Sequence, residues 1–199
     1  MPLVRRDPPP AAAGTAVEEL VAALADADPA RRREAARALG AAGGDPAPLA
    51  RALATERDPA VREALFTGLI RLGAAAPLLP FLRVEDAALR SAAVEALQDL
   101  PDQVRPHMPA LLDDADPDVR LLAAEVARGL PAEEATRLLC ARLEVEPHRN
   151  VCAACVEVLA EAGTPAALPT LHALAARFAD DPFLPFACAA AIARLGGQG

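Results

Sequence analysis

A segment of sixteen residues recurs along this chain in six related copies, and this repetition restricts the possible folds more than any other feature. Successive copies begin 30, 28, 30, 32 and 33 residues apart. A near-constant period in this range is typical of solenoids, in which each repeat buries its apolar side against its neighbours. The best-defined copy is DPAVREALFTGLIRLG, and the six copies begin at Asp28, Asp58, Asp86, Asp116, His148 and Asp181.

Each copy has the start and stop signals of a helix. An aspartate followed by proline opens four copies, as expected for a helix cap and a first helical residue. Small and apolar residues then recur at three- and four-residue steps, which predicts one apolar helix face. Glycine or proline ends the copies, at Gly43, Gly73, Pro101, Pro131, Gly163 and Gly196.

The intervals between the copies predict a second, apolar-sided helix in each repeat. Prolines lie inside or at the start of several of these helices, so some are expected to be kinked or short. No segment alternates like a strand, and the apolar content is mainly alanine, leucine and valine, which favours an all-α protein. The expected helices cover residues 15–25, 46–54, 75–83, 104–112, 132–143 and 165–178.

Each pair of helices can bury its apolar faces only against neighbouring pairs. We therefore predict an all-α fold, namely an α-solenoid of about six helical hairpins with a right-handed superhelix. We expect a disordered segment at residues 1–13 and a single array at 14–196. The expected repeats are 14–43, 44–73, 74–101, 102–131, 132–163 and 164–196.

The pattern D-P-x-V-R-x-x-A-A-x-x-L-x-x-L-G resembles the HEAT-like repeat of the phycobilisome-lyase type over nearly the whole chain. The resemblance implies that the aspartate caps the second helix of each hairpin and that the arginine four residues later forms a ladder between repeats. The matching aspartates are Asp28, Asp58, Asp86 and Asp116, and the matching arginines are Arg32, Arg62, Arg90 and Arg120.

The last two copies depart from this pattern. Cys152 and Pro185 replace the arginine, and His148 replaces one aspartate. We therefore expect the ladder to fail toward the C-terminal end of the array, where apolar packing would hold the repeats.

Charge limits the partners of the chain. The formal net charge is −8 and the sequence contains arginine but no lysine. A negative chain disfavours nucleic acid and favours a protein partner with a basic surface. No apolar run predicts a secretory signal or a membrane span, and four cysteines without such a signal favour a cytoplasmic location.

Four cysteines, Cys140, Cys152, Cys155 and Cys188, are the strongest candidates for chemistry. The favoured interpretation is that Cys155 and Cys188 are small core residues, because zinc needs four converging ligands and the cysteine columns of adjacent helices are roughly 8–10 Å apart. Metal or cluster binding and redox sensing stay open as alternatives. Cys152 is expected to be the exposed thiol, and no metal or cofactor is predicted.

Aligning the repeats also predicts an acidic stripe on the second helices, which in HEAT-like arrays usually line the concave face. Beside this stripe lie apolar residues at repeat positions that are expected to be exposed or half-exposed. Exposed apolar groups next to a charged stripe suit a protein interface. A plain solvated helix face is the alternative interpretation. The predicted partner-binding residues are Glu63, Phe66, Glu95, Leu121, Glu125, Val156, Glu157 and Phe186.

Together these features predict a non-enzymatic protein-binding scaffold or adaptor. Neither a nucleophile elbow nor a P-loop lysine is present in the sequence. The alternative from a different class is a bilin-lyase-like enzyme, or a metal or cofactor chaperone, that uses the cysteine-containing C-terminal repeats.

Overall fold

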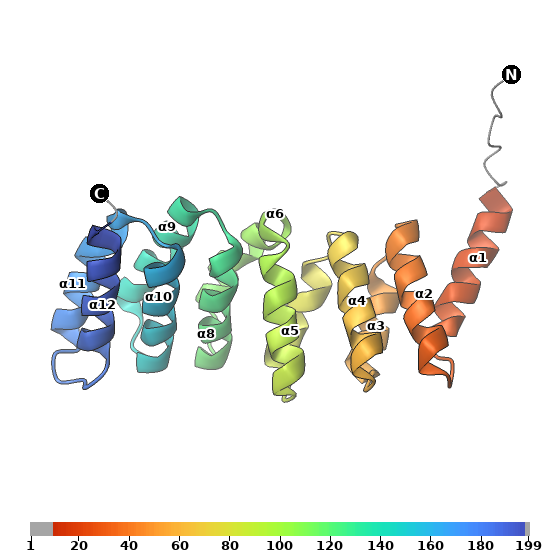
Figure 1. Ribbon diagram of the computed structural model, residues 1–199, viewed down its shortest axis with the longest axis horizontal. Helices are drawn as coiled ribbons and strands as arrows, with labels where there is room; N and C mark the ends of the chain where they lie inside the picture. Colours follow the sequence, from red (N-terminus) through yellow and green to blue (C-terminus); the bar gives the residue numbers. More distant parts are fainter. Residues whose placement is uncertain (1–9, 198–199) are drawn as a thin grey trace, which may run out of the picture. The chain divides into compact units, whose positions relative to one another are not determined.

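The computed structural model describes residues 10–197, and over that range the chain is an all-α solenoid, as predicted. These residues form twelve α-helices and four 3-10 helices and no strand (Figure 1). The helices pack into two compact units, one ending at Leu78 and the other beginning at Leu79. No helix within residues 10–197 is long and apolar enough to cross a membrane.

The first unit consists of two helical hairpins. In each, a first helix precedes a second helix, and the second helices α2 and α4 lie side by side (Figure 1). Helix α1 begins earlier than the expected start of the array at residue 14, whereas residues 1–9 of the expected disordered segment lie outside the described residues. The bounds are α1 Pro10–Ala23, α2 Pro29–Ala42, α3 Ala47–Thr55 and α4 Pro59–Arg71, followed by the 3-10 helix η1 Ala76–Arg83, which contains the boundary between the units.

The second unit continues the same arrangement. Its second helices α5, α8, α10 and α12 pack in series, each against the next, and α9 and α11 pack together in the other layer. The bounds are α5 Ala87–Gln98, α6 Pro101–Val104, η2 Arg105–His107, α7 Met108–Leu112, α8 Pro117–Val126, η3 Ala127–Gly129, α9 Ala132–Val145, α10 Arg149–Ala162, η4 Pro165–Ala167, α11 Leu168–Arg177 and α12 Leu184–Gly196.

Aspartates cap the starts of the second helices. The carboxylate of Asp58 accepts hydrogen bonds from the backbone N–H groups of Ala60 and Val61 at 2.9 and 3.1 Å. These bonds satisfy donors that the first turn of a helix otherwise leaves free. Asp28, Asp86 and Asp116 make the same kind of bond, whereas His148 at the start of α10 makes no side-chain capping bond.

Prolines break several first helices, as the sequence indicates. The helix expected at residues 75–83 is the 3-10 helix η1, with Pro80 inside it. The helix expected at 104–112 is divided into α6, η2 and α7, because Pro106 and Pro109 lack the N–H that a continuous α-helix needs. The second helices are regular and therefore form the more continuous layer of each unit.

Two glycines allow close contact between the second helices of the first unit. A Cβ atom added at Gly40 of α2 would lie 2.5 Å from the Cα of Gly68 in α4. The two backbones are therefore too close for a side chain at this crossing. Leucines fill the surrounding core, and Leu49, Leu53, Leu65 and Leu69 have 1% or less of their surface exposed.

Carboxylates located two residues before the cap position complete the arginine ladder. Arg32 donates to both carboxylate oxygens of Glu56 in the next repeat, at 2.7 and 3.0 Å. Arg120 makes the equivalent pair with Glu146, at 2.8 Å for both bonds. Each carboxylate also accepts a backbone N–H two residues later, from Asp58 or His148. Charge-assisted bonds thus join one repeat to the turn of the next.

The other two ladder arginines bind carbonyl groups within their own repeat. Arg62 donates to the backbone oxygen of Glu56, and Arg90 donates to those of Val84 and Glu85. Arg32 and Arg120 also donate to backbone oxygens in the turn before their own helix, so all four arginines hold that turn. Of them, Arg32 and Arg120 also bind the carboxylates of the next repeat just described.

In the C-terminal repeats, an arginine from the following repeat occupies the place of the missing one. The thiol of Cys152 donates to the backbone oxygen of Glu146 at 3.5 Å. Arg177, at the end of α11, donates to the backbone oxygens of Glu144 and Glu146 at 2.8 and 2.9 Å. The Arg177 guanidinium thus reaches the turn at Glu146 from the following repeat, and its polar contacts supplement the apolar packing expected here.

Candidate functional site: an acidic face on the second unit

A hollow of about 300 Å³ lies between α5 and α8 in the layer of second helices. Glu95 is exposed on α5 and Glu125 is half-buried on α8, and both line the hollow. Val94 and Leu122 add apolar surface to its walls. Arg128 lines it as well, so the hollow combines two carboxylates and one guanidinium with apolar surface.

Neighbouring groups fix the position of Glu125. The side-chain amide of Gln98 on α5 donates to the backbone oxygen of Glu125 at 2.8 Å, which ties the two walls together. The guanidinium of Arg128 donates to the Glu125 carboxylate at 2.8 Å. Burial raises the pKa of Glu125; the charge of Arg128 opposes this, and the charges of Glu157 and Glu161 add to it.

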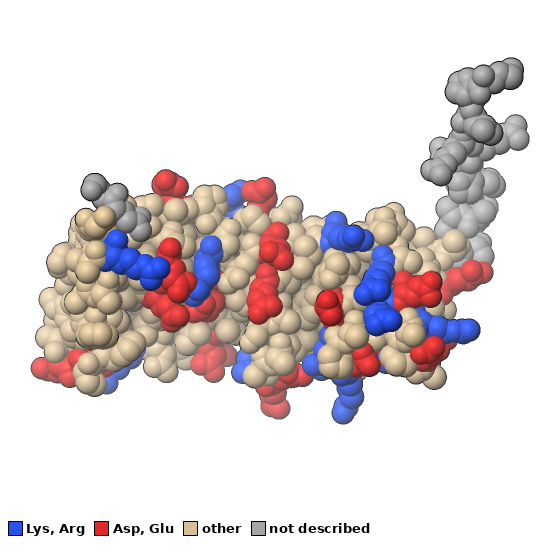
Figure 2. All heavy atoms as spheres, in the orientation of Figure 1, with Lys and Arg blue, Asp and Glu red and all other residues tan. Residues whose placement is uncertain are grey.

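Helix α10 extends the negative surface. Glu157 and Glu161 are both exposed, one turn apart on this helix, and Glu161 pairs with the second nitrogen of Arg128. Acidic side chains gather over α5, α8 and α10 on the face shown in Figure 2. Glu95, Glu125, Glu157 and Glu161 with Arg128 are called the acidic face below.

The acidic face is incompletely neutralised. Its four carboxylates and one guanidinium leave a net charge of −3 when all five groups are ionised. The Nε of Arg128 is buried and has no hydrogen-bond partner, although its two terminal nitrogens bind Glu125 and Glu161. One arginine thus bridges two of the glutamates and leaves the others free to attract a cation.

Not all predicted partner-binding residues belong to this face. The structure brings Glu95, Glu125 and Glu157 into one region of the second unit, whereas Glu63 is exposed on α4 of the first unit. Leu121 is half-buried on α8, and Phe186 is 72% exposed on α12.

Phe66 and Val156, expected to be exposed or half-exposed, are buried, with 7% and 2% of their surface exposed, so that expectation is wrong. Helix α10 packs between α8 and α12, and these neighbours cover both of its flanks. A stacked helix therefore exposes a narrower strip than the periodicity of a single helix indicates, and Val156 lies outside that strip. We do not assign Phe66 or Val156 to a binding surface.

The cysteines are mostly internal. Cys155 and Cys188 have no exposed surface, as the core interpretation predicts, and Cys140 is half-buried. Cys152 is also fully buried, so its predicted exposure is wrong; the turn at Glu146 and the side chain of Arg177 contact its sulfur. Among residues 10–197, no three or more histidine, cysteine or acidic side chains are grouped so that they could hold a metal ion.

Two members of the acidic face, Arg128 and Glu161, were not predicted from the sequence. Arg128 lies three residues after Glu125, and Glu161 lies four residues after Glu157. Residues at these separations are neighbours on a helix surface, so the spacing could have indicated both. The missed carboxylates Glu56 and Glu146 likewise share one position two residues before the start of a repeat copy.

The chain is a helical repeat protein. No protein family model matches it, and no curated protein matches it. Among solved structures, the chain is similar to an engineered protein at 17% identity and a TM-score of 0.42, covering 92% of this chain and 98% of the other. It is also similar to a designed armadillo repeat protein, at 18% identity and a TM-score of 0.39.

A third similar structure is that of computationally designed armadillo repeat proteins for modular peptide recognition, at 18% identity and a TM-score of 0.43. Both armadillo comparisons cover 90% of this chain and 99% of the designed chain. At these identities and TM-scores, none of these likenesses says what this chain does.

Proposed function

We propose that this chain is a non-enzymatic adaptor whose acidic face binds a protein with a basic surface. The observation that carries the proposal is the hollow between α5 and α8, which has Glu95 and Glu125 on its walls and an apolar lining. Lysine and arginine side chains have an apolar stem and a charged end. Such a side chain would place its stem against Leu122 and its charge beside Glu95, while Glu125 stays paired with Arg128.

Electrostatics supports a cationic ligand over an anionic or neutral one. A carboxylate whose pKa is raised by burial and by neighbouring glutamates gains most when a positive charge arrives. The exposed carboxylates on α10 would attract a basic surface from a distance and increase the rate of encounter. The same charges disfavour a nucleic acid backbone.

The hairpins themselves support a scaffold function. We assign them to HEAT-like repeats of the phycobilisome-lyase type, on the D-P-x-V-R pattern and the aspartate caps that accompany it. Stacked hairpins present a rigid surface, and rigid elements hold binding side chains more accurately than loops do.

Carbodiimide crosslinking tests this proposal directly. The reagent joins carboxylates to amines, and this chain contains no lysine. Apart from its N-terminal amine, every crosslink from its carboxylates must therefore reach another molecule. After reaction in an extract of the native cell, mass spectrometry should find lysines of one partner attached to Glu95, Glu157 or Glu161.

The matched control is Glu144, an exposed glutamate on α9 in the layer of first helices. The Glu95→Gln/Glu157→Gln variant should lose most crosslinks to the partner, whereas Glu144→Gln should retain them. Crosslinks distributed evenly over exposed carboxylates, or equal yields from both variants, would contradict the assignment of the acidic face.

A further inference from the structure

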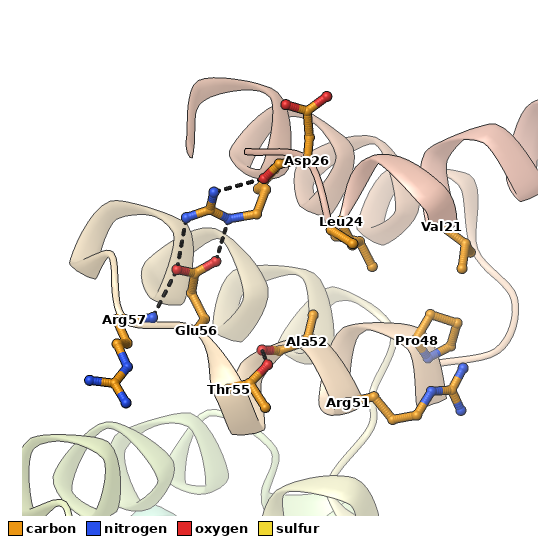
Figure 3. A pocket seen from close by; sticks show the side chains of 11 residues that line it. Val21, Leu24, Asp26, Pro48, Arg51, Ala52, Thr55, Glu56 and Arg57 are labelled. Atoms are coloured by element: carbon orange, nitrogen blue, oxygen red, sulfur yellow. Dashed lines mark hydrogen bonds and ion pairs between the residues drawn. The ribbon is translucent and has the colours of Figure 1, made fainter. Parts of the chain in front are cut away.

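The first unit contains a second hollow, of about 570 Å³, between α1 and α3 (Figure 3). Val21 and Leu24 line it from α1 and the turn after it, and Pro48 and Ala52 line it from α3. Its volume is within the range of sites that bind small molecules or short peptide segments. The apolar lining requires a ligand with an apolar part.

Two arginines stand at opposite ends of this hollow (Figure 3). Arg51 is exposed on α3 and Arg57 is exposed just after the helix ends. Neither guanidinium has a hydrogen-bond or ion-pair partner among residues 10–197. Both positive charges are therefore available to a ligand.

The remaining charges that line the hollow are already paired within the protein. The Glu56 carboxylate accepts two bonds from Arg32, at 2.7 and 3.0 Å. The Asp26 carboxylate pairs with Arg31 at 3.3 Å. The net charge offered to a ligand is therefore positive here, in contrast to the acidic face of the second unit.

We propose that this hollow binds an extended acidic peptide segment with a carboxylate at each end and an apolar side chain between them. This site is separate from the acidic face and does not depend on its function. The two arginines would each bind one carboxylate, and the apolar side chain would pack between Leu24 and Ala52. A guanidinium can bind a carboxylate through two parallel charge-assisted hydrogen bonds, which are stronger than neutral ones.

The spacing of the arginines suggests the spacing of the acids. Four helical steps and two extended steps separate Arg51 from Arg57, so their Cα atoms are about 13 Å apart at most. In an extended peptide, residues four apart lie about 13 Å from each other and point to the same side. The residue midway between them also points to that side, which places an apolar group over the hollow.

The probe is therefore the peptide acetyl-Glu-Ser-Leu-Ser-Glu amide, titrated into the isotope-labelled full-length protein at low salt. Backbone amide shifts should change around α1 and α3 and saturate. Arg51→Gln and Arg57→Gln should each raise the Kd about fivefold, with helical content unchanged by circular dichroism. The control Arg37→Gln removes an exposed arginine of α2 that does not line the hollow, and should leave the Kd unchanged.

Two further peptides test the two parts of the proposal. Replacing both glutamates by glutamine should weaken binding by at least tenfold, and replacing leucine by serine should weaken it about fivefold. Equal binding of all three peptides, equal Kd values for Arg51→Gln and Arg37→Gln, or no saturable shifts around α1 and α3 would each overturn the proposal.

Discussion

Glu146 has only 1% of its surface exposed, and its carboxylate accepts two hydrogen bonds from Arg120, both 2.8 Å long. The Glu146 carboxylate also lies 2.9 Å from the guanidinium of Arg142 in the preceding helix α9. Burial alone would raise the pKa of Glu146. The bonds from Arg120 and the His148 N–H, together with the charge of Arg142, outweigh burial and hold this pKa below its usual value. One buried carboxylate thus joins two consecutive repeats of the second unit.

Removing Arg120 should therefore destabilise the second unit strongly. In Arg120→Met, Glu146 keeps its buried charge but loses its bidentate partner, and we expect a loss of about 3 kcal/mol in the free energy of unfolding. Urea unfolding followed by circular dichroism measures this loss. The control Arg137→Met removes an exposed arginine of α9 and should change stability by less than about 0.5 kcal/mol. Equal effects of the two substitutions would show that the pair does not hold the repeats together.

The equivalent pair in the first unit predicts a pH dependence. The hydrogen bonds from Arg32 lower the pKa of Glu56 from its usual 4.5 to about 2. A carboxyl whose pKa is lower in the folded than in the unfolded state stabilises the fold above its unfolded pKa. This contribution should therefore be lost as the pH falls from about 4.5 to about 2. Melting temperatures of Glu56→Gln should fall less steeply over this window than those of the wild type, and parallel curves would contradict the assignment.

The contact between Gly40 and Gly68 predicts that alanine at position 40 destabilises the fold, although alanine usually stabilises a helix. Alanine is intrinsically better than glycine in a helix by about 1 kcal/mol. At Gly40, however, the added Cβ would lie 2.5 Å from the Gly68 Cα, and relieving such overpacking costs about 1–3 kcal/mol. We expect Gly40→Ala to lower the melting temperature. Gly196→Ala, where nothing lies within 4 Å, should leave it unchanged or raise it, and the opposite order of the two variants would disprove the close crossing.

Thiol reactivity tests the arrangement of the cysteines. Burial raises the pKa of Cys188 to about 11 and also raises the pKa values of Cys140, Cys152 and Cys155. Accessibility therefore decides the order of reaction, and Cys152, Cys155 and Cys188 are fully covered. We expect Ellman's reagent to react first with the half-buried Cys140 and with all four thiols only after denaturation. Cys140→Ser should remove the fast phase. A fast phase that instead disappears in Cys152→Ser would contradict the burial of Cys152.

The regular parts of the fold were predictable because local chemistry determines them. Asp58 followed by proline predicts the start of α4, and the capping bonds to Ala60 and Val61 show why. Proline likewise predicts the irregular first helices, because it removes a backbone donor wherever it occurs. The acidic column of Glu95, Glu125 and Glu157 follows from the constant period of the repeat, since equal offsets in stacked helices lie side by side.

Features that depend on a neighbouring repeat were not predictable from one helix at a time. Val156 is buried because α8 and α12 cover both flanks of α10, and Cys152 is covered because Arg177 reaches back from the next repeat. The hollow between α1 and α3 has no sequence motif either. It arises where two first helices leave space between apolar side chains, and only the packing defines it.

The association rate of the chain with its crosslinked partner tests the acidic face most directly. Charged groups that steer association make the rate fall with rising salt. We predict that Glu95→Lys/Glu157→Lys lowers the rate constant at low salt at least tenfold and weakens its salt dependence, whereas Glu144→Lys changes neither. The same rate and the same salt dependence for wild type and double variant would show that the acidic face does not bind the partner.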